Sequence, residues 1–175
     1  MDVASAPSVN PEGGVGIGTT LDTSPSRYQK PEVATDPPGL THILGWHKWL
    51  LGWLDPSQLT CVSSPATVEE TLTPLAASGG KKLVVVPVRD SYAYVVELRG
   101  RIGADKGACD EGVIVYSIDS TRNGYDDPVL LRGRLRCGLL TPGAFRTGGV
   151  YEDETVKVEV LATDGRDYRV RVTKK

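Results

Sequence analysis

The C-terminal segment of the chain carries the pattern that most constrains the fold. Along 156–160 valines alternate with charged residues, and along 168–172 tyrosine and valine alternate with arginines. Asp164 and Gly165 lie between these two segments. Period-two alternation on both sides of an Asp-Gly pair is the strongest short-range signal of a β-hairpin. The pattern therefore predicts a hairpin that packs one face inward and leaves a charged face in solvent.

Three further apolar segments predict strands. Residues 81–88 and 92–99 flank a short polar turn, which indicates a second hairpin. Residues 112–119 form a β-branched run that is typical of a buried strand. Residues 120–128 and 141–153 lack such a pattern and are predicted to be loops. We therefore expect one helix followed by about six to eight short strands, arranged as a β-sandwich or a half-barrel.

Residues 40–55 precede these strands, and their apolar residues recur at helical spacing. A helix here places Gly45, Lys48 and Gly52 opposite a wide apolar face. A surface helix needs an apolar stripe only ~100° wide, and this face is wider. The helix is therefore expected to be buried on two sides, against the following domain and against a second surface. The residues expected at this interface are Ile43, Trp46, Trp49, Leu50 and Trp53.

Composition sets the limits of the domain. Residues 1–39 are rich in Pro, Gly, Ser and Thr and show no periodicity, so we expect a disordered tail. Residues 56–175 are expected to form one β-rich domain. The net charge of -2 comes from scattered charges, whereas a nucleic-acid surface needs clustered Lys and Arg. No run of apolar residues is long enough for a membrane-spanning helix, so no membrane partner is expected.

The chain offers little for a catalytic centre. Its two histidines, His42 and His47, lie five positions apart, whereas the zinc-binding H-E-x-x-H motif places two histidines four apart with a Glu between them. His47 falls on the apolar face of the expected helix and is interpreted as a core histidine. The nucleophile motif G-x-S-x-G is absent from the sequence. We therefore predict no catalytic residue and no cofactor in this chain.

One segment carries the spacing of a calcium-binding loop. The stretch DSTRNGYDD, residues 119–127, has oxygen-bearing side chains at the positions that such loops use. The twelfth position, where these loops place a bidentate Glu, is Leu130, so such a site would be open and weak. The alternative is an Asx-rich turn after a strand. The candidate calcium ligands are Asp119, Thr121, Asn123 and Asp127.

Four segments, taken in order, resemble a known family. GWHKWLLGWL, residues 45–54, resembles the helix that ends the catalytic domain of M6-type zinc metallopeptidases, the immune inhibitor A group. Residues 71–88, 92–119 and 156–172 resemble the β-rich region that follows that helix. The most specific feature is YVVELR followed by GVIVYSID, with a loop containing Gly and Asp between them. The resemblance covers residues 42–173.

The resemblance implies a secreted, extracellular protein. In the family an H-E-x-x-H helix holds the zinc, with the Glu as general base, and it precedes the segment that matches residues 45–54. This chain has no such motif, so no zinc ligand or catalytic residue carries over. The resemblance thus implies a non-catalytic downstream β domain that is inactive alone. Its expected partner is a metallopeptidase catalytic domain, or a second copy bound through the Trp-rich helix.

Secretion bears on the three cysteines, Cys61, Cys109 and Cys137. Under the resemblance, Cys61 and Cys109 are the candidates for a disulfide. Such a bond would close a loop of about 48 residues and stabilise the fold by roughly 3–4 kcal/mol. Cys137 would then remain unpaired. The alternative is three buried thiols.

Two other functions stay open from the sequence. The chain could be an independent β-sandwich module that binds carbohydrate or protein, or a hydrolase that uses Glu97 and Asp119 as paired carboxylates. Glu97 also shares a strand face with Arg99, and the two are interpreted as an ion pair across a sheet face. A carbohydrate platform would be built mainly from the tyrosines Tyr92, Tyr94, Tyr116, Tyr125 and Tyr151.

Overall fold

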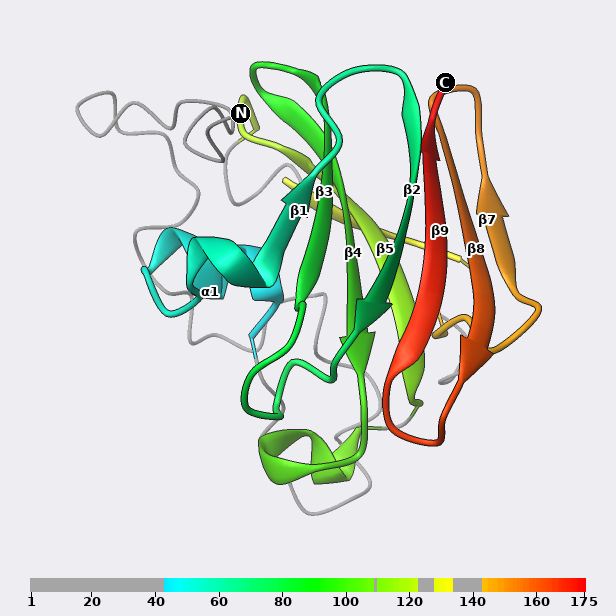
Figure 1. Ribbon diagram of the computed structural model, residues 1–175. Coiled ribbons are helices and arrows are strands. Elements are labelled where there is room, and N and C mark those ends of the chain that lie inside the picture. The colour runs from blue at the N-terminus through cyan, green and yellow to red at the C-terminus, as the bar shows by residue number, and fades with distance from the viewer. Residues whose placement is uncertain (1–42, 109, 123–127, 134–142) are drawn as a thin grey trace.

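The computed structural model describes residues 43–108, 110–122, 128–133 and 143–175. In them the chain forms two β-sheets packed face to face, with one short α-helix on the outer side of one sheet (Figure 1). The predicted mainly β, sandwich-like fold is confirmed. The segment predicted as a disordered tail, 1–39, lies outside the described residues.

The first sheet has five strands in the order β1-β3-β4-β5-β6. Adjacent strands of this sheet pair antiparallel, except that β1 runs parallel to β3. A crossover connection, which contains β2 of the other sheet, therefore separates β1 from β3. The strands are β1 (Leu59–Cys61), β3 (Leu83–Arg89), β4 (Tyr92–Arg99), β5 (Gly112–Asp119) and β6 (Val129–Arg132).

The second sheet is antiparallel and has four strands in the order β2-β9-β8-β7. Its hairpin β8–β9 is the one that the alternating C-terminal pattern predicts. Valines of both strands fill the space between the sheets, while Lys157, Glu159 and Arg171 lie on the other face. The strands are β2 (Ala66–Leu72), β7 (Val150–Glu152), β8 (Val156–Thr163) and β9 (Tyr168–Lys174).

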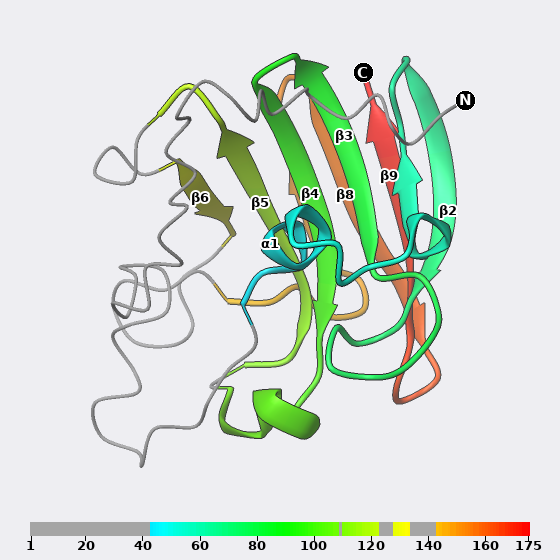
Figure 2. The ribbon, with the colours of Figure 1, turned by 90° about the vertical axis from the view of Figure 1, so that its left-hand side faces the viewer.

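The first sheet is apolar on both faces. In β4, Val96 faces the second sheet, whereas Val95 belongs to a separate apolar cluster on the outer face. Near-continuous apolar strands of this kind are buried on both sides. The helix α1 (Gly45–Leu50) lies across the outer face, which Figure 2 shows from the front. Trp46 anchors the helix in the outer cluster, with 2 % of its surface exposed.

The helix is shorter than the predicted 40–55. At its end, Gly52 adopts a φ of 71°, and Trp53 N–H donates to the carbonyl of Lys48. Together with a bond from Gly52 N–H to the carbonyl of Trp49, this is a Schellman motif, which stops a helix at a left-handed glycine. At the other end, Leu44 is extended, so the helix begins at Gly45. Periodicity alone missed this stop because Gly52 was interpreted as a helical residue.

The orientation of the helix also differs from the prediction. Gly45 and Lys48, expected opposite the apolar face, are buried. Leu50 and Trp53, two of the residues expected to meet a second surface, are 40 % and 63 % exposed in this chain, so their interface stays a prediction. Gly45 is buried because its N–H donates to the Glu97 carboxylate on the sheet, and Trp53 lies beyond the Schellman motif that ends the helix.

Several short strands were not predicted from the sequence. The segment 141–153, expected to be a loop, contains β7, and Phe145 forms an isolated bridge with Val113. The strands β1 and β6 were also not predicted; they have three and four residues, too few to show an alternating pattern. These short strands form because they pair with adjacent strands of the folded chain, β1 with β3 and β6 with β5.

Candidate functional site

Glu97 of β4 stands at the centre of a buried polar network under α1. Its side chain is fully buried and points to the outer face of the first sheet. One carboxylate oxygen, Oε2, accepts from Gly45 N–H at 2.7 Å and from the Tyr116 hydroxyl at 2.7 Å. The Tyr116 hydroxyl in turn accepts from Trp46 N–H at 3.1 Å. The first two backbone N–H groups of α1 are thus capped by side chains of the sheet.

Arg99, the last residue of β4, connects Glu97 to Asp105 in this network. Its Nε donates to Glu97 Oε1 at 2.8 Å, and its Nη1 donates to Asp105 Oδ1 at 3.1 Å. Its Nη2 donates to the backbone carbonyl of Ile43 at 3.2 Å. Burial disfavours the charged guanidinium, but the two carboxylates raise the pKa of Arg99. Burial and the charge of Glu97 raise the pKa of Tyr116, so Tyr116 keeps its proton.

Sequence reasoning underestimated this group. The Glu97–Arg99 pair was expected on a sheet face, and it does lie on one, but α1 covers that face. Asp105, in the 3-10 helix Gly103–Gly107, was not singled out at all. A usable signal was present in YVVELR, because a strand that is apolar on both faces buries any charged residue within it. Such a charge needs partners nearby.

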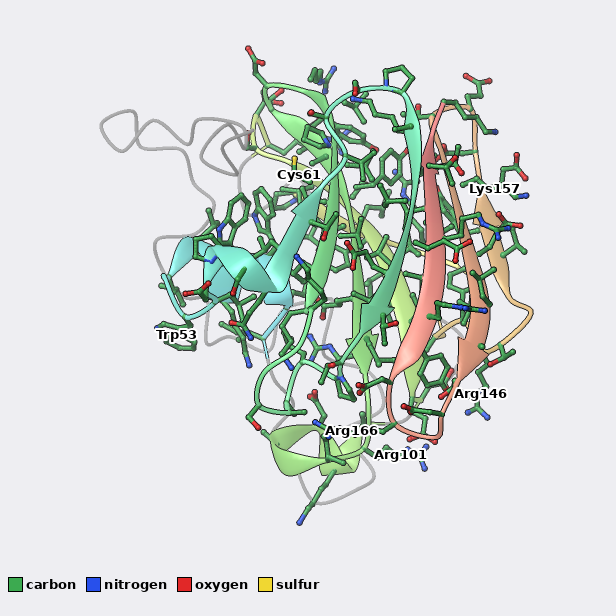
Figure 3. The ribbon with its side chains drawn as sticks, in the orientation of Figure 1. Trp53, Cys61, Arg101, Arg146, Lys157 and Arg166 are labelled. Carbon is green, nitrogen blue, oxygen red and sulfur yellow. The ribbon has the colours of Figure 1, made fainter. Side chains whose placement is uncertain are left out.

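A second feature is an exposed apolar surface, the apolar turn, made of Leu50, Leu51 and Trp53. Their exposed fractions are 40 %, 42 % and 63 %. Figure 3 shows Trp53 at the end of α1, directed away from the sandwich. Of the five predicted interface residues, Trp46 is buried within the chain, Ile43 and Trp49 are half-buried, and only Leu50 and Trp53 are exposed.

Lys82 is a buried cation near this network. Its Nζ donates to the carbonyls of Pro74 at 2.9 Å and Ala77 at 2.8 Å. Burial, together with the positive charges of Arg166 and Lys48, lowers its pKa from 10.5 to about 8, against the opposing charge of Asp167. These two hydrogen bonds hold the loop 73–81 against the start of β3, so we interpret the role of Lys82 as structural.

Lys82 predicts a dependence of stability on pH. Because its pKa is lower in the folded state than in the unfolded state, the unfolded chain binds more protons between about pH 8 and 10.5. The contribution of Lys82 to the free energy of unfolding should therefore rise with pH across this window. Urea unfolding of the wild type and of Lys82→Met at a series of pH values measures the difference. A difference that stays constant with pH would contradict the prediction.

Two of the four candidate calcium ligands, Asp119 and Thr121, lie in the described part of the chain. Asp119 Oδ1 accepts from both the backbone N–H and the hydroxyl of Thr121, and its Oδ2 pairs with Arg89 at 3.2 Å. These bonds are those of an Asx turn, which the sequence offered as the alternative. The other two candidates, Asn123 and Asp127, lie outside the described residues.

Cys61, at the end of β1, is a free thiol in the described part of the chain, and burial raises its pKa. Its candidate partner Cys109 and the third cysteine, Cys137, lie outside the described residues, so the pairing stays a prediction.

The tyrosines proposed as a carbohydrate platform are divided between two places. Tyr92, Tyr94 and Tyr151 meet at the edge of the sandwich, where Tyr92 and Tyr94 pack edge to face. Tyr94 is buried, and the hydroxyls of Tyr94 and Tyr151 both donate to Asp153 at 2.6 Å. Tyr116 lies on the opposite face of the first sheet, in the network under α1. These rings form internal contacts rather than a flat exposed surface. Tyr125 lies outside the described residues.

Glu97 and Asp119 are not placed as a catalytic pair. In the register of β4 and β5, Glu97 is opposite Ile114 and Asp119 is opposite Tyr92. The two carboxylates are therefore five residues apart along the sheet, or ~17 Å. Glycosidases need separations of about 5–9.5 Å. Glu97 is moreover covered by α1.

Within the described ranges, no group of three or more His, Cys, Asp or Glu side chains is placed to hold a metal ion. The described helices are all too short to cross a membrane. No known protein family, curated protein or solved structure matches this chain.

Proposed function

We propose that this chain is the non-catalytic β domain of an M6-type zinc metallopeptidase and packs against a catalytic domain through the apolar turn. The observation that carries the proposal is the exposure of three large apolar side chains, Leu50, Leu51 and Trp53, within four consecutive residues. Contiguous exposed apolar residues on a folded domain mark sites of protein association. Tryptophan is also among the residues that contribute most to binding energy at interfaces.

The apolar turn is held in place by the domain beneath it. The Schellman motif fixes the backbone of the turn, and Trp46 packs against Trp49 with ring centroids 5.1 Å apart. Glu97 and Arg99 bind the backbone at the start of the helix. A surface that is ordered before binding loses little conformational entropy on association. This arrangement supports a docking surface rather than an accidentally exposed side chain.

The position of the turn agrees with a catalytic domain as the partner. The helix α1 precedes every described strand and lies on the outer face of the first sheet, away from the second sheet (Figure 1). In the family that the sequence resembles, the catalytic domain precedes this helix. The partner surface should therefore offer an apolar pocket that receives the indole of Trp53.

The change Trp53→Ala tests this docking surface. We expect the wild-type chain to form a complex with a separately produced M6-type catalytic domain in sedimentation velocity, and Trp53→Ala to reduce the affinity by at least tenfold, since buried tryptophans at interfaces contribute about 2 kcal/mol or more. Val150→Ala is the matched control, because Val150 is 47 % exposed on β7 of the other sheet. The affinity of Val150→Ala for the catalytic domain should equal that of the wild type.

The chain alone could instead self-associate. If Trp53→Ala abolished that self-association, a second copy of the chain, rather than a catalytic domain, would be the partner that binds the apolar turn. A monomer that binds no catalytic domain would contradict the docking proposal. The relation to metallopeptidases has an independent test in the DNA upstream of Met1. An in-frame H-E-x-x-H supports the relation, and a stop codon with no such motif before it contradicts the relation.

A further inference from the structure

A second site lies at the edge of the sandwich where β6 and β7 are the last described strands of their sheets. Arg132, the last residue of β6, directs its guanidinium between the two sheets. Its Nη2 donates to the Tyr92 hydroxyl and to Ser117 Oγ, both at 3.0 Å. The guanidinium carbon lies 5.9 Å from the ring centroid of Tyr94. Two hydrogen bonds and an aromatic ring thus fix the orientation of a cation at this edge.

The charge of this guanidinium is not balanced within the described part of the chain. No described carboxylate lies within ion-pair distance of Arg132. Its Nε is buried and has no acceptor among the described residues. Arg89, which lies 5.4 Å from the Tyr92 ring, is already paired with Asp119. A half-buried cation without a counter-ion is costly for the folded state, and such groups are frequently functional.

The nearest acidic group in the tyrosine cluster is already occupied. Asp153 Oδ2 accepts from the hydroxyls of Tyr94 and Tyr151, and Oδ1 accepts from the backbone N–H groups of Thr155 and Val156. Burial opposes ionisation of Asp153, but these four hydrogen bonds lower its pKa to about 2. With four donors bound, Asp153 has no lone pair directed toward a further cation. Asp153 is therefore not available as a counter-ion for Arg132.

We propose that Arg132 anchors an anion-binding site between the edges β6 and β7, and that the site takes a ligand with a single carboxylate. The guanidinium is oriented through Nη2, while Nη1 makes no bond to a described residue. Arg is suited to carboxylates because its planar donors match their two oxygens. The single positive charge of Arg132, which no described carboxylate compensates, fits one carboxylate, whereas a phosphate dianion calls for more than one cation.

The chemistry allows two sources of the carboxylate, an acidic sugar or an acidic peptide. The test is NMR titration of the full ¹⁵N-labelled chain with glucuronate, N-acetylglutamate or phosphate at constant ionic strength. We expect saturable chemical-shift changes of the Ser117, Arg132 and Gly133 amides with at least one of the two carboxylates. The carboxylate that binds more tightly identifies the ligand class, glucuronate an acidic sugar and N-acetylglutamate an acidic peptide. Phosphate that binds more tightly than both carboxylates, or shifts that never saturate, would overturn the proposal.

Variants separate this site from general surface charge. Arg132→Gln should abolish the saturable shifts, and Arg132→Lys, which keeps the charge but loses the planar donor set, should weaken them. Arg146→Gln is the matched control, because Arg146 is an exposed arginine paired with Asp110 elsewhere on the surface. Unchanged amide shifts in β9 check that each variant is folded. Equal responses in the wild type and in Arg132→Lys and Arg132→Gln would refute the role of Arg132.

Discussion

Replacing Glu97 with Leu should lower the free energy of unfolding by about 3–5 kcal/mol. The carboxylate accepts from Gly45 N–H, the Tyr116 hydroxyl and Arg99 Nε, all of them buried. Leu fills a similar volume but accepts no hydrogen bond, so three buried donors lose their partner. Removing one member of a buried ion pair is far more destabilising than removing an exposed pair, because the remaining charge stays out of water.

Urea unfolding followed by circular dichroism measures this effect. Glu69→Leu is the control, because Glu69 forms an exposed ion pair with Arg171 and should change stability by less than about 1 kcal/mol. Glu97→Gln should fall between the two, since its amide oxygen can still accept from Gly45 and Tyr116. Glu97→Leu should also shift tryptophan emission to the red before the sheets unfold, as α1 detaches. Equal stability of Glu97→Leu and Glu69→Leu would show that the network does not hold the helix.

Gly45→Ala should destabilise the protein by about 1–3 kcal/mol, although alanine is the better helix former. A Cβ at this position would overlap the side chain of Leu83 and lie 2.7 Å from Glu97 Oε2. Helix propensity favours alanine over glycine by only about 1 kcal/mol, so the steric term decides the sign. To make room, α1 would have to move off the sheet, which would lengthen the bond from Gly45 N–H to Glu97.

The comparison with Gly52→Ala isolates the steric effect. Gly52 has a φ of 71°, and a Cβ there meets no atom within 4 Å, so its cost comes from backbone strain alone. Both variants should be destabilised in thermal unfolding, but only Gly45→Ala should change the near-UV signal of Trp46. A Gly45→Ala protein more stable than the wild type, as propensity alone predicts, would place the helix further from the sheet than described.

The strands that the sequence predicted best are those with an intrinsic pattern. The segment 112–119 coincides with β5, and the hairpin around Asp164-Gly165 is β8–β9. Local alternation specifies a strand and its buried face because each side chain direction follows from the pleat. By contrast, β7, within the predicted loop 141–153, carries only three residues and exists through its pairing with β8.

The candidate sites were harder to predict than the strands, as Arg99 and Arg132 show. Both are arginines at strand ends, and neither position indicates what surrounds it. Arg99 meets two carboxylates because Asp105 returns beside it from the next loop. Arg132 meets two hydroxyls and an aromatic ring because three strands align there. Contacts between distant segments depend on register, which periodicity does not provide.

By itself, the sequence determined that this chain is mainly β, that its C-terminal hairpin buries valines and exposes charges, and that a Trp-rich segment precedes the strands. Only the tertiary structure decided which side of that segment is covered. Glu97 binds the helix at Gly45, next to the buried Trp46, and the left-handed Gly52 ends the helix before Trp53, which is 63 % exposed. The helical pattern is apolar on several sides, and a pattern without one dominant face leaves the orientation to the specific hydrogen bonds of the folded protein.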